Sequence, residues 1–236
     1  MINLAIDTCD RNGSVALRID GRCVGLRLHE EQEYSSWLLP AVEELLAESA
    51  EVYSDLELLS VANGPGSFTG VRVGLCAVKA WSEVYRLPVV GVSRLEAMAR
   101  QSPAAEWVAA TYDAHRGQVF AGLYRRTGGE LELVEAEMVI APEEFLSWVK
   151  VRANGEKVQW LSLDPELFTG LSSWKELEAT GASLTKSEAG LANLIGELGE
   201  RKAARGEFTE VLQLDANYVR RSDAEIYWKG PAHRVG

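Results

Sequence analysis

Hydrophobic and polar positions alternate along the start of the chain in the way that antiparallel strands require. An apolar run over residues 2–7 predicts a buried strand. Apolar residues then occupy every second position over residues 15–19 and 24–28, on either side of the pair Asp20-Gly21. Two alternating runs around an Asp-Gly pair predict a β-hairpin. The chain therefore begins with three consecutive antiparallel strands.

Apolar residues recur three and four positions apart in the next stretch, which is the spacing of one helix face. This spacing predicts a helix over about residues 36–49. The rest of the first half is expected to hold a strand at 58–62, a glycine-rich segment at 64–74, a helix at about 69–85, a strand at 89–92, and a helix opened by the capping box Ser93-Arg94-Leu95-Glu96.

The pattern restarts near residues 101–103, and the second half repeats the same order of elements more loosely. Its expected strands cover 107–112, 118–124, 132–140 and 158–163, and its expected helices cover 142–149 and the stretch after a capping box at 185–188. Because the same order of strands and helices occurs twice, the sequence predicts an α/β protein of two lobes, residues 1–102 and 103–236. Each lobe is expected to be a mixed β-sheet flanked by helices. The helix after Thr185 either stays with the second lobe or packs back on the first.

Composition and charge narrow the class of protein. Apolar residues make up 47% and charged residues 25% of the 236, as in globular proteins. No apolar run reaches the length of about 18 residues that a membrane span needs. The formal charge of −11 disfavours a stand-alone RNA binder, because phosphate binding depends on Lys and Arg. Three scattered cysteines fit a reducing cytoplasm, so a cytoplasmic location is expected.

The segment from Gly64 to Gly74 is the first candidate site, because it joins a strand to a helix. Gly64 and Gly66 let the backbone turn sharply and present its N–H groups, and the helix start adds a positive dipole end. Together with Ser67, and with Asp7 at the end of the first strand, the segment could bind an anion or a nucleotide. A tight structural turn explains the same residues. The segment matches neither a Walker loop nor the dinucleotide fingerprint.

The predicted helix at 69–85 carries a stripe of small residues, Gly70, Gly74 and Ala77, beside apolar Val73 and Ala80. Glycine inside a helix costs about 1 kcal/mol relative to alanine, so Gly74 requires the close approach of another part of the protein. Two explanations stay open. The neighbour is either a part of the same domain or a helix of another subunit.

Residues typical of catalysis are sparse. His29, His115 and His233 lack the short spacing of a metal-binding pair. The chain has no nucleophile elbow, and no base is indicated for Ser67. The sequence therefore predicts neither catalytic residues nor a metal site.

Four stretches of the chain resemble one known family. They are Leu4–Thr8 with Gly13–Ala16, then Leu38-Leu39-Pro40, Gly64–Gly74, and Asp113–Phe120. Tyr218-Val219-Arg220 is similar to the family's terminal motif. The family is TsaB (YeaZ), the dimerisation subunit of the bacterial tRNA threonylcarbamoyladenosine complex. The resemblance implies an actin-like (RNase H-like) fold of two related lobes.

The resemblance also implies a scaffold and activator subunit and not an enzyme. The catalytic relative TsaD carries a His-x-x-x-His pair on its first helix, whereas the stretch Glu33–Trp37 contains no histidine. The helices at 36–49 and 69–85 are expected to meet the same helices of TsaD, or of a second copy when TsaD is absent. TsaE joins through the complex, and tRNA is contacted only indirectly. The interface residues expected on the two helices are Trp37, Leu38, Ala41, Leu45, Gly70, Val73, Gly74, Ala77, Ala80 and Trp81.

No cofactor of its own is expected for the chain, although ATP or ADP could bind at the interface of the complex. Two rival hypotheses are an actin-fold ATPase or kinase that acts through Asp7 and the glycine-rich segment, and a peptidase, because the family was once grouped with glycoproteases. The first rival requires nucleotide binding by the isolated chain. The second lacks a nucleophile–base pair in the sequence.

Overall fold

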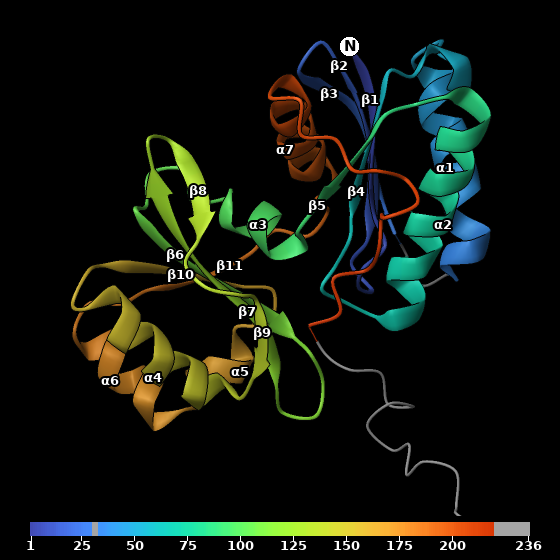
Figure 1. Cartoon of the computed structure of the whole chain (residues 1–236). Helices are drawn as coiled ribbons and strands as arrows, with labels where there is room; N and C mark the ends of the chain where they lie inside the picture. The colour runs from blue at the N-terminus through green and yellow to red at the C-terminus, as the bar shows by residue number, and fades with distance from the viewer. Residues whose placement is uncertain (30–32, 220–236) are drawn as a thin grey trace, which may run out of the picture.

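A computed structural model describes residues 1–29 and 33–219, which form two lobes with one mixed β-sheet each (Figure 1). The strand orders are β3-β2-β1-β4-β5 in the first lobe and β11-β10-β6-β7-β8 in the second, where β9 pairs with β7. In the first lobe β1 pairs antiparallel with β2 and parallel with β4, which follows the lobe's first helix. In the second lobe β6 pairs in the same way, antiparallel with β7 and parallel with β10. The predicted fold class, with one topology used twice, is confirmed.

The first lobe contains β1 (Ile2–Asp7), β2 (Ser14–Ile19), β3 (Arg22–Leu28), α1 (Tyr34–Glu48), a 3-10 turn (Tyr53–Asp55), β4 (Leu58–Ala62), α2 (Phe68–Tyr85), β5 (Val89–Val92) and α3 (Arg94–Ala99). The predicted hairpin is confirmed. Asp20 and Gly21 have φ angles of 48° and 77°, the left-handed pair that a tight two-residue turn requires.

The second lobe contains β6 (Trp107–Asp113), β7 (Val119–Thr127), β8 (Glu130–Leu133), β9 (Met138–Ile140), α4 (Pro142–Ala153), β10 (Val158–Ser162), α5 (Glu166–Thr169), α6 (Ser172–Ala179) and β11 (Leu184–Lys186), followed by α7 (Ala192–Ala204). Among the described residues, no helix is long and apolar enough to cross a membrane.

Three predictions for the second half are wrong in detail. The single strand expected at 132–140 is two strands, β8 and β9, which pair with different parts of β7. The expected capping box at 185–188 begins with strand residues of β11, and α7 starts only at Ala192 without a side-chain cap. The helices α5 and α6 were not predicted, because α6 buries only Trp174 and so shows little helical periodicity.

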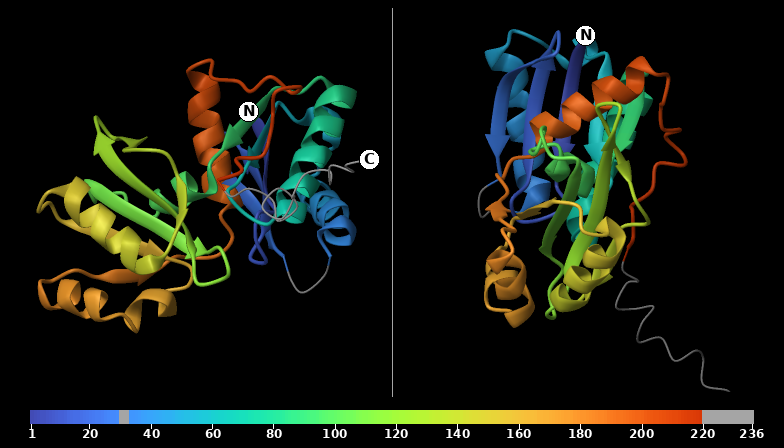
Figure 2. Two further views of the ribbon diagram at one scale, coloured as in Figure 1. Left: turned by 60° about the horizontal axis from the view of Figure 1, so that its bottom comes forward. Right: turned by 90° about the vertical axis from the view of Figure 1, so that its left-hand side faces the viewer.

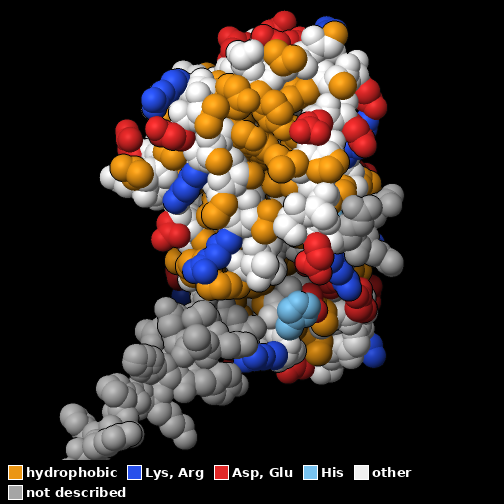
Figure 3. All heavy atoms as spheres, turned by 90° about the vertical axis from the view of Figure 1, so that its right-hand side faces the viewer, with side chains coloured by type: hydrophobic (Ala, Val, Ile, Leu, Met, Phe, Trp, Pro, Cys, Tyr) orange, Lys and Arg blue, Asp and Glu red, His pale blue; other side chains and the backbone are white. Residues whose placement is uncertain are grey.

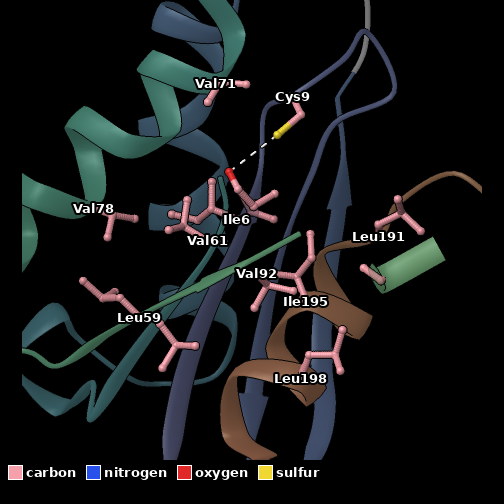
Figure 4. Packing of buried hydrophobic residues seen from close by; sticks show 14 of the residues in the cluster. Ile6, Cys9, Leu59, Val61, Val71, Val78, Val92, Leu191, Ile195 and Leu198 are labelled. Carbon is pink, nitrogen blue, oxygen red and sulfur yellow. Dashed lines mark hydrogen bonds between the residues drawn. The ribbon is translucent and has the colours of Figure 1, made fainter. Parts of the chain in front are cut away.

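The sheet of the first lobe lies between two helical layers (Figures 1 and 2). Helices α1 and α2 cover one face, and α7 covers the other, so α7 packs back on the first lobe. Apolar side chains on the strands meet Val71 and Val78 of α2 on one side, and Ile195 and Leu198 of α7 lie on the other (Figure 4). Both ends of the described chain therefore build this lobe.

Small residues let α7 approach the sheet closely. A Cβ atom added to Gly199 would collide with Ser60 of β4, and one added to Gly196 would lie 3.0 Å from Ala5. At the same contact the buried Asn3 donates to the carbonyl oxygen of Gly196 at 3.0 Å.

Helix α2 packs just as closely on the end of β1. The Thr8 hydroxyl donates to the Gly70 carbonyl at 2.7 Å and accepts from the Gly74 N–H at 3.1 Å, so it bridges one turn of the helix. A Cβ at Gly74 would lie 2.5 Å from Thr8 Oγ1, and one at Gly70 would collide with the Thr8 carbonyl oxygen. Of the two explanations for Gly74, packing within the same domain is the one that the structure shows.

The variant Gly74→Ala is expected to lower the free energy of unfolding by about 1–3 kcal/mol, because the new methyl group overpacks against the Thr8 hydroxyl. Elsewhere in a helix the same change stabilises by up to about 1 kcal/mol. Urea unfolding measures the difference. Thr8→Ala in the same background should recover part of the loss, because it removes the hydroxyl that the added methyl group meets and lets the N–H at position 74 bond to the Gly70 carbonyl. A Gly74→Ala protein as stable as the parent would contradict this packing.

Candidate functional site

The glycine-rich loop after β4 wraps around the end of β1. The Ser67 N–H donates to the Cys9 carbonyl oxygen at 2.6 Å, and a Cβ at Gly66 would collide with the same carbonyl group. The Ser67 side chain caps α2 by accepting from the Gly70 N–H at 3.4 Å. The loop is therefore a tight turn that begins α2 at a fixed place.

Asp7, at the end of β1, is fully buried and paired with Arg94 of α3. Arg94 Nε donates to Asp7 Oδ2 at 2.9 Å, and both side chains are 0% exposed. The other oxygen, Asp7 Oδ1, accepts from the Cys9 N–H at 2.9 Å. Both oxygens of this buried carboxylate therefore already accept a hydrogen bond from within the chain.

Arg94 connects the two lobes. Its Cζ lies 4.6 Å from the centre of the Tyr112 ring in β6, and the Tyr112 hydroxyl donates to the Pro65 carbonyl oxygen in the glycine-rich loop. The Arg94 N–H also donates to the Gly64 carbonyl oxygen at 2.8 Å. Burial disfavours the charged guanidinium, but the carboxylate of Asp7 raises the pKa of Arg94 above its ordinary value.

The structure buries most of the predicted anion or nucleotide site. Asp7 and Gly64 are buried, Gly66 is half-buried, and only Ser67 is exposed. The four residues do lie around one turn, but Asp7 faces an arginine of its own chain. The carboxylate of Asp7 forms an internal ion pair with Arg94, and its part in nucleotide binding stays a prediction.

Arg94 is the residue that reasoning from the sequence missed, because it was taken only as part of a capping box. Its backbone neighbour Ser93 does cap α3, accepting from the Glu96 N–H at 3.3 Å. A signal was present, since a basic residue in the first turn opposes the helix dipole and needs another partner.

Seven of the ten residues expected at the partner interface are buried in the first lobe's own core or against its own backbone. These are Trp37, Leu38, Ala41, Leu45, Gly70, Gly74 and Trp81. The helical spacing that singled out these residues marks the inner side of each helix, since the apolar stripe of a helix faces the core. These residues were expected to contact a partner, but they face the interior of the first lobe instead.

The outer sides of the two helices form what we call the α1–α2 face. Of the expected interface residues, Ala80 is exposed here, and Val73 and Ala77 are half-exposed. Larger apolar side chains that were not predicted join them, namely Leu39 of α1, 49% exposed, and Val84 of α2, 69% exposed. Hydrophobic side chains gather in a broad patch on this side of the molecule (Figure 3). The face has the chemistry of a protein-binding surface.

The variant Arg94→Met is expected to lower the free energy of unfolding by about 3–5 kcal/mol, because it leaves the Asp7 carboxylate buried without its partner. The double variant Asp7→Asn/Arg94→Met removes both charges and should lie closer to the parent. Denaturant unfolding of the three proteins provides the comparison. Loss of less than about 1 kcal/mol in the single variant would show that the pair is not a structural ion pair.

Comparisons with known proteins agree with this geometry. The model of the family described as TsaD, tRNA N6-adenosine threonylcarbamoyltransferase, matches residues 29–174. The chain is 30% identical to a Bacillus subtilis (strain 168) protein named "tRNA threonylcarbamoyladenosine biosynthesis protein TsaB", over 97% of this chain and 98% of the relative. It is 31% identical to the Escherichia coli (strain K12) protein of the same name, over 96% of each.

Solved structures show the same relationship. "YeaZ from Pseudomonas aeruginosa" superposes with a TM-score of 0.73 at 29% identity, over 92% of this chain and 99% of that one. Component A of the (R)-2-hydroxyglutaryl-CoA dehydratase from Acidaminococcus fermentans has a TM-score of 0.51 at 11% identity, over 86% of this chain and 99% of that one, and shares the fold alone. The chain thus has an actin-like fold and belongs to the TsaB (YeaZ) family of tRNA threonylcarbamoyladenosine biosynthesis proteins.

Proposed function

We propose that this chain is a non-catalytic scaffold and activator subunit of the cytoplasmic complex that makes N6-threonylcarbamoyladenosine in tRNA. It binds a TsaD-type transferase subunit through the α1–α2 face and, through the assembled complex, a TsaE-type ATPase. Transfer RNA is contacted only through these partners, in keeping with the chain's formal charge of −11.

The observation that carries the proposal is the exposed apolar surface of the α1–α2 face. Val84, Leu39 and Ala80 face outward while the inner sides of both helices are fixed in the core. Scattered exposed apolar residues are common, but a contiguous patch on two adjacent helices is typical of a surface that packs against another protein. The same face is available to a second copy of the chain, so we propose a homodimer when the transferase subunit is absent.

The non-catalytic role is supported by the state of Asp7. An ATPase or kinase of this fold would need the strand-end carboxylate for its ligand, whereas here Arg94 Nε holds it at 2.9 Å in the interior. In this proposal ATP or ADP belongs to the interface of the complex and not to a cleft of this chain. The peptidase hypothesis gains nothing, because Ser67 caps α2 and no described side chain is seen to act as its base.

The variant Val84→Glu is expected to weaken binding to the transferase subunit at least tenfold, because it places a charge in the apolar patch. Val151→Glu is the matched control, since Val151 is also 69% exposed but lies on α4 of the other lobe. Titration calorimetry with the purified transferase subunit measures both dissociation constants. Equal effects of the two variants, or no complex with the parent chain at micromolar concentration, would overturn the proposal.

A further inference from the structure

Near the start of α2, two aromatic rings hold the side chain of Arg72 in one orientation. The Arg72 guanidinium carbon lies 3.6 Å from the centre of the Phe68 ring and 5.9 Å from that of the Tyr218 ring. Arg72 Nε donates to the Tyr218 hydroxyl at 2.8 Å, and the two rings stack with their centres 5.6 Å apart. We call Phe68, Arg72 and Tyr218 the arginine clamp. A guanidinium held in this way loses little freedom when it binds a further group.

The backbone beside Tyr218 is attached to both lobes. The Asn217 N–H donates to the Asn63 carbonyl oxygen at 2.6 Å, just before the glycine-rich loop. Asn217 Nδ2 donates to Glu137 Oε2 of the second lobe at 2.6 Å. Tyr218 therefore approaches Arg72 from a segment that is anchored independently of α2.

Arg72 keeps most of its hydrogen-bonding capacity unused. Among residues 1–29 and 33–219, only Tyr218 accepts a hydrogen bond from this guanidinium, and no carboxylate lies within ion-pair distance of it. The one acidic residue of α2, Glu83, lies about 16 Å further along the helix and pairs with Arg86 at 3.2 Å. Nη1 and Nη2 of Arg72 thus present four N–H donors to which the described residues offer no acceptor.

The acidic residues of α1 are engaged elsewhere. Glu44 and Glu48 both pair with Arg27 of β3. Burial, and next the charge of Glu43, raise the pKa of Tyr53 to about 12, and the Tyr53 ring packs at the last turn of α2, the end opposite to the clamp. Neither of the two helices therefore places a carboxylate beside the clamp.

The clamp adjoins the α1–α2 face. Arg72, Cys76 and Ala80 follow one another at four-residue spacing and are all exposed, so they lie along one side of α2. Phe68 is also 45% exposed and Tyr218 43% exposed. Arginine and tyrosine are enriched among the side chains that contribute most to the affinity of protein interfaces. A protein that docks on the apolar patch therefore meets an oriented positive charge at the edge of the patch.

We propose that Arg72 receives a carboxylate side chain of the transferase subunit when that subunit docks on the α1–α2 face, with Nη1 and Nη2 donating to its two oxygens. A planar guanidinium matches a carboxylate in this bidentate geometry, which an ammonium group cannot copy. Phe68 and Tyr218 are positioning residues that set the plane of the guanidinium.

The inference rests on the function proposed above and adds the chemistry that fixes the partner at one place on the face. A protein carboxylate is favoured over an RNA phosphate for two reasons. The apolar patch beside the clamp fits a protein, and the chain's formal charge of −11 disfavours RNA.

Titration calorimetry with the purified transferase subunit tests the role of Arg72. Arg72→Met keeps the apolar stem and should raise the dissociation constant about tenfold. Arg72→Lys keeps the charge without the fork and should raise it about threefold or more. Lys79→Met is the matched control, since Lys79 is a half-exposed basic residue of the same helix, and should change it less than about twofold. The urea midpoint of each variant confirms that it is folded.

Double-mutant cycles test the carboxylate and the positioning by Tyr218. Each acidic residue on the transferase helices that meet the face is changed to its amide, one at a time. One change should weaken binding of the parent about tenfold and leave Arg72→Met nearly unaffected, because the pair is already broken. Tyr218→Phe should weaken binding about two- to threefold in the parent but not in Arg72→Met, since the hydroxyl acts only through the guanidinium.

Equal affinities of the parent and Arg72→Met, or the absence of any coupled acidic residue, would overturn the inference and leave the proposed function intact. So would an Arg72→Met protein that binds the transferase normally but loses self-association or binding of transfer RNA, because a second copy or a phosphate would then be the occupant. A parent chain that does not bind the transferase subunit would instead overturn the proposed function, and this inference with it.

Discussion

The ion pair between Asp7 and Arg94 is the constraint on which the arrangement of the two lobes depends. A carboxylate without exposed surface must have a charged or hydrogen-bonding partner, and here that partner comes from α3, between the sheets. Its guanidinium lies against Tyr112 of the second lobe, and Tyr112 in turn binds the loop that begins α2. The end of one central strand, the start of α3, the second sheet and the glycine-rich loop therefore share one contact.

The position of α2 follows from that contact and from the residues after Asp7. The Thr8 hydroxyl bridges Gly70 and Gly74 of α2, and the Cys9 carbonyl oxygen accepts from the Ser67 N–H in the turn before the helix. Because these contacts use backbone groups on a rigid sheet, the outer side of α2 is held at a fixed angle before any partner arrives. A surface that is already ordered loses little conformational entropy on binding. The glycines thus support the α1–α2 face from beneath and do not belong to it.

Much of the fold could be predicted because its elements have strong local patterns. The Asp20-Gly21 hairpin, the buried strands and the first two helices all depend on periodicity and turn chemistry that a short stretch of sequence contains. The wrong predictions concern contacts between distant residues. Helical spacing identified the apolar sides of α1 and α2, but the same spacing describes a core and an interface, so Leu45 and Gly74 were assigned outward while they pack inward. Arg94 was not predicted as a site residue because its partner, Asp7, is 87 residues away in the sequence.

The first lobe contains both ends of the described chain, and this has a consequence for how the protein is made. During synthesis the N-terminal part emerges first and begins to fold before the rest exists. Here β1, β2 and β4 leave one face of their sheet uncovered until α7 has been made, and the outer edge of β5 stays open until Thr209 follows. A nascent or prematurely ended chain thus displays an unfinished lobe to chaperones and proteases. The first lobe is therefore finished only after both α7 and Thr209 have been made.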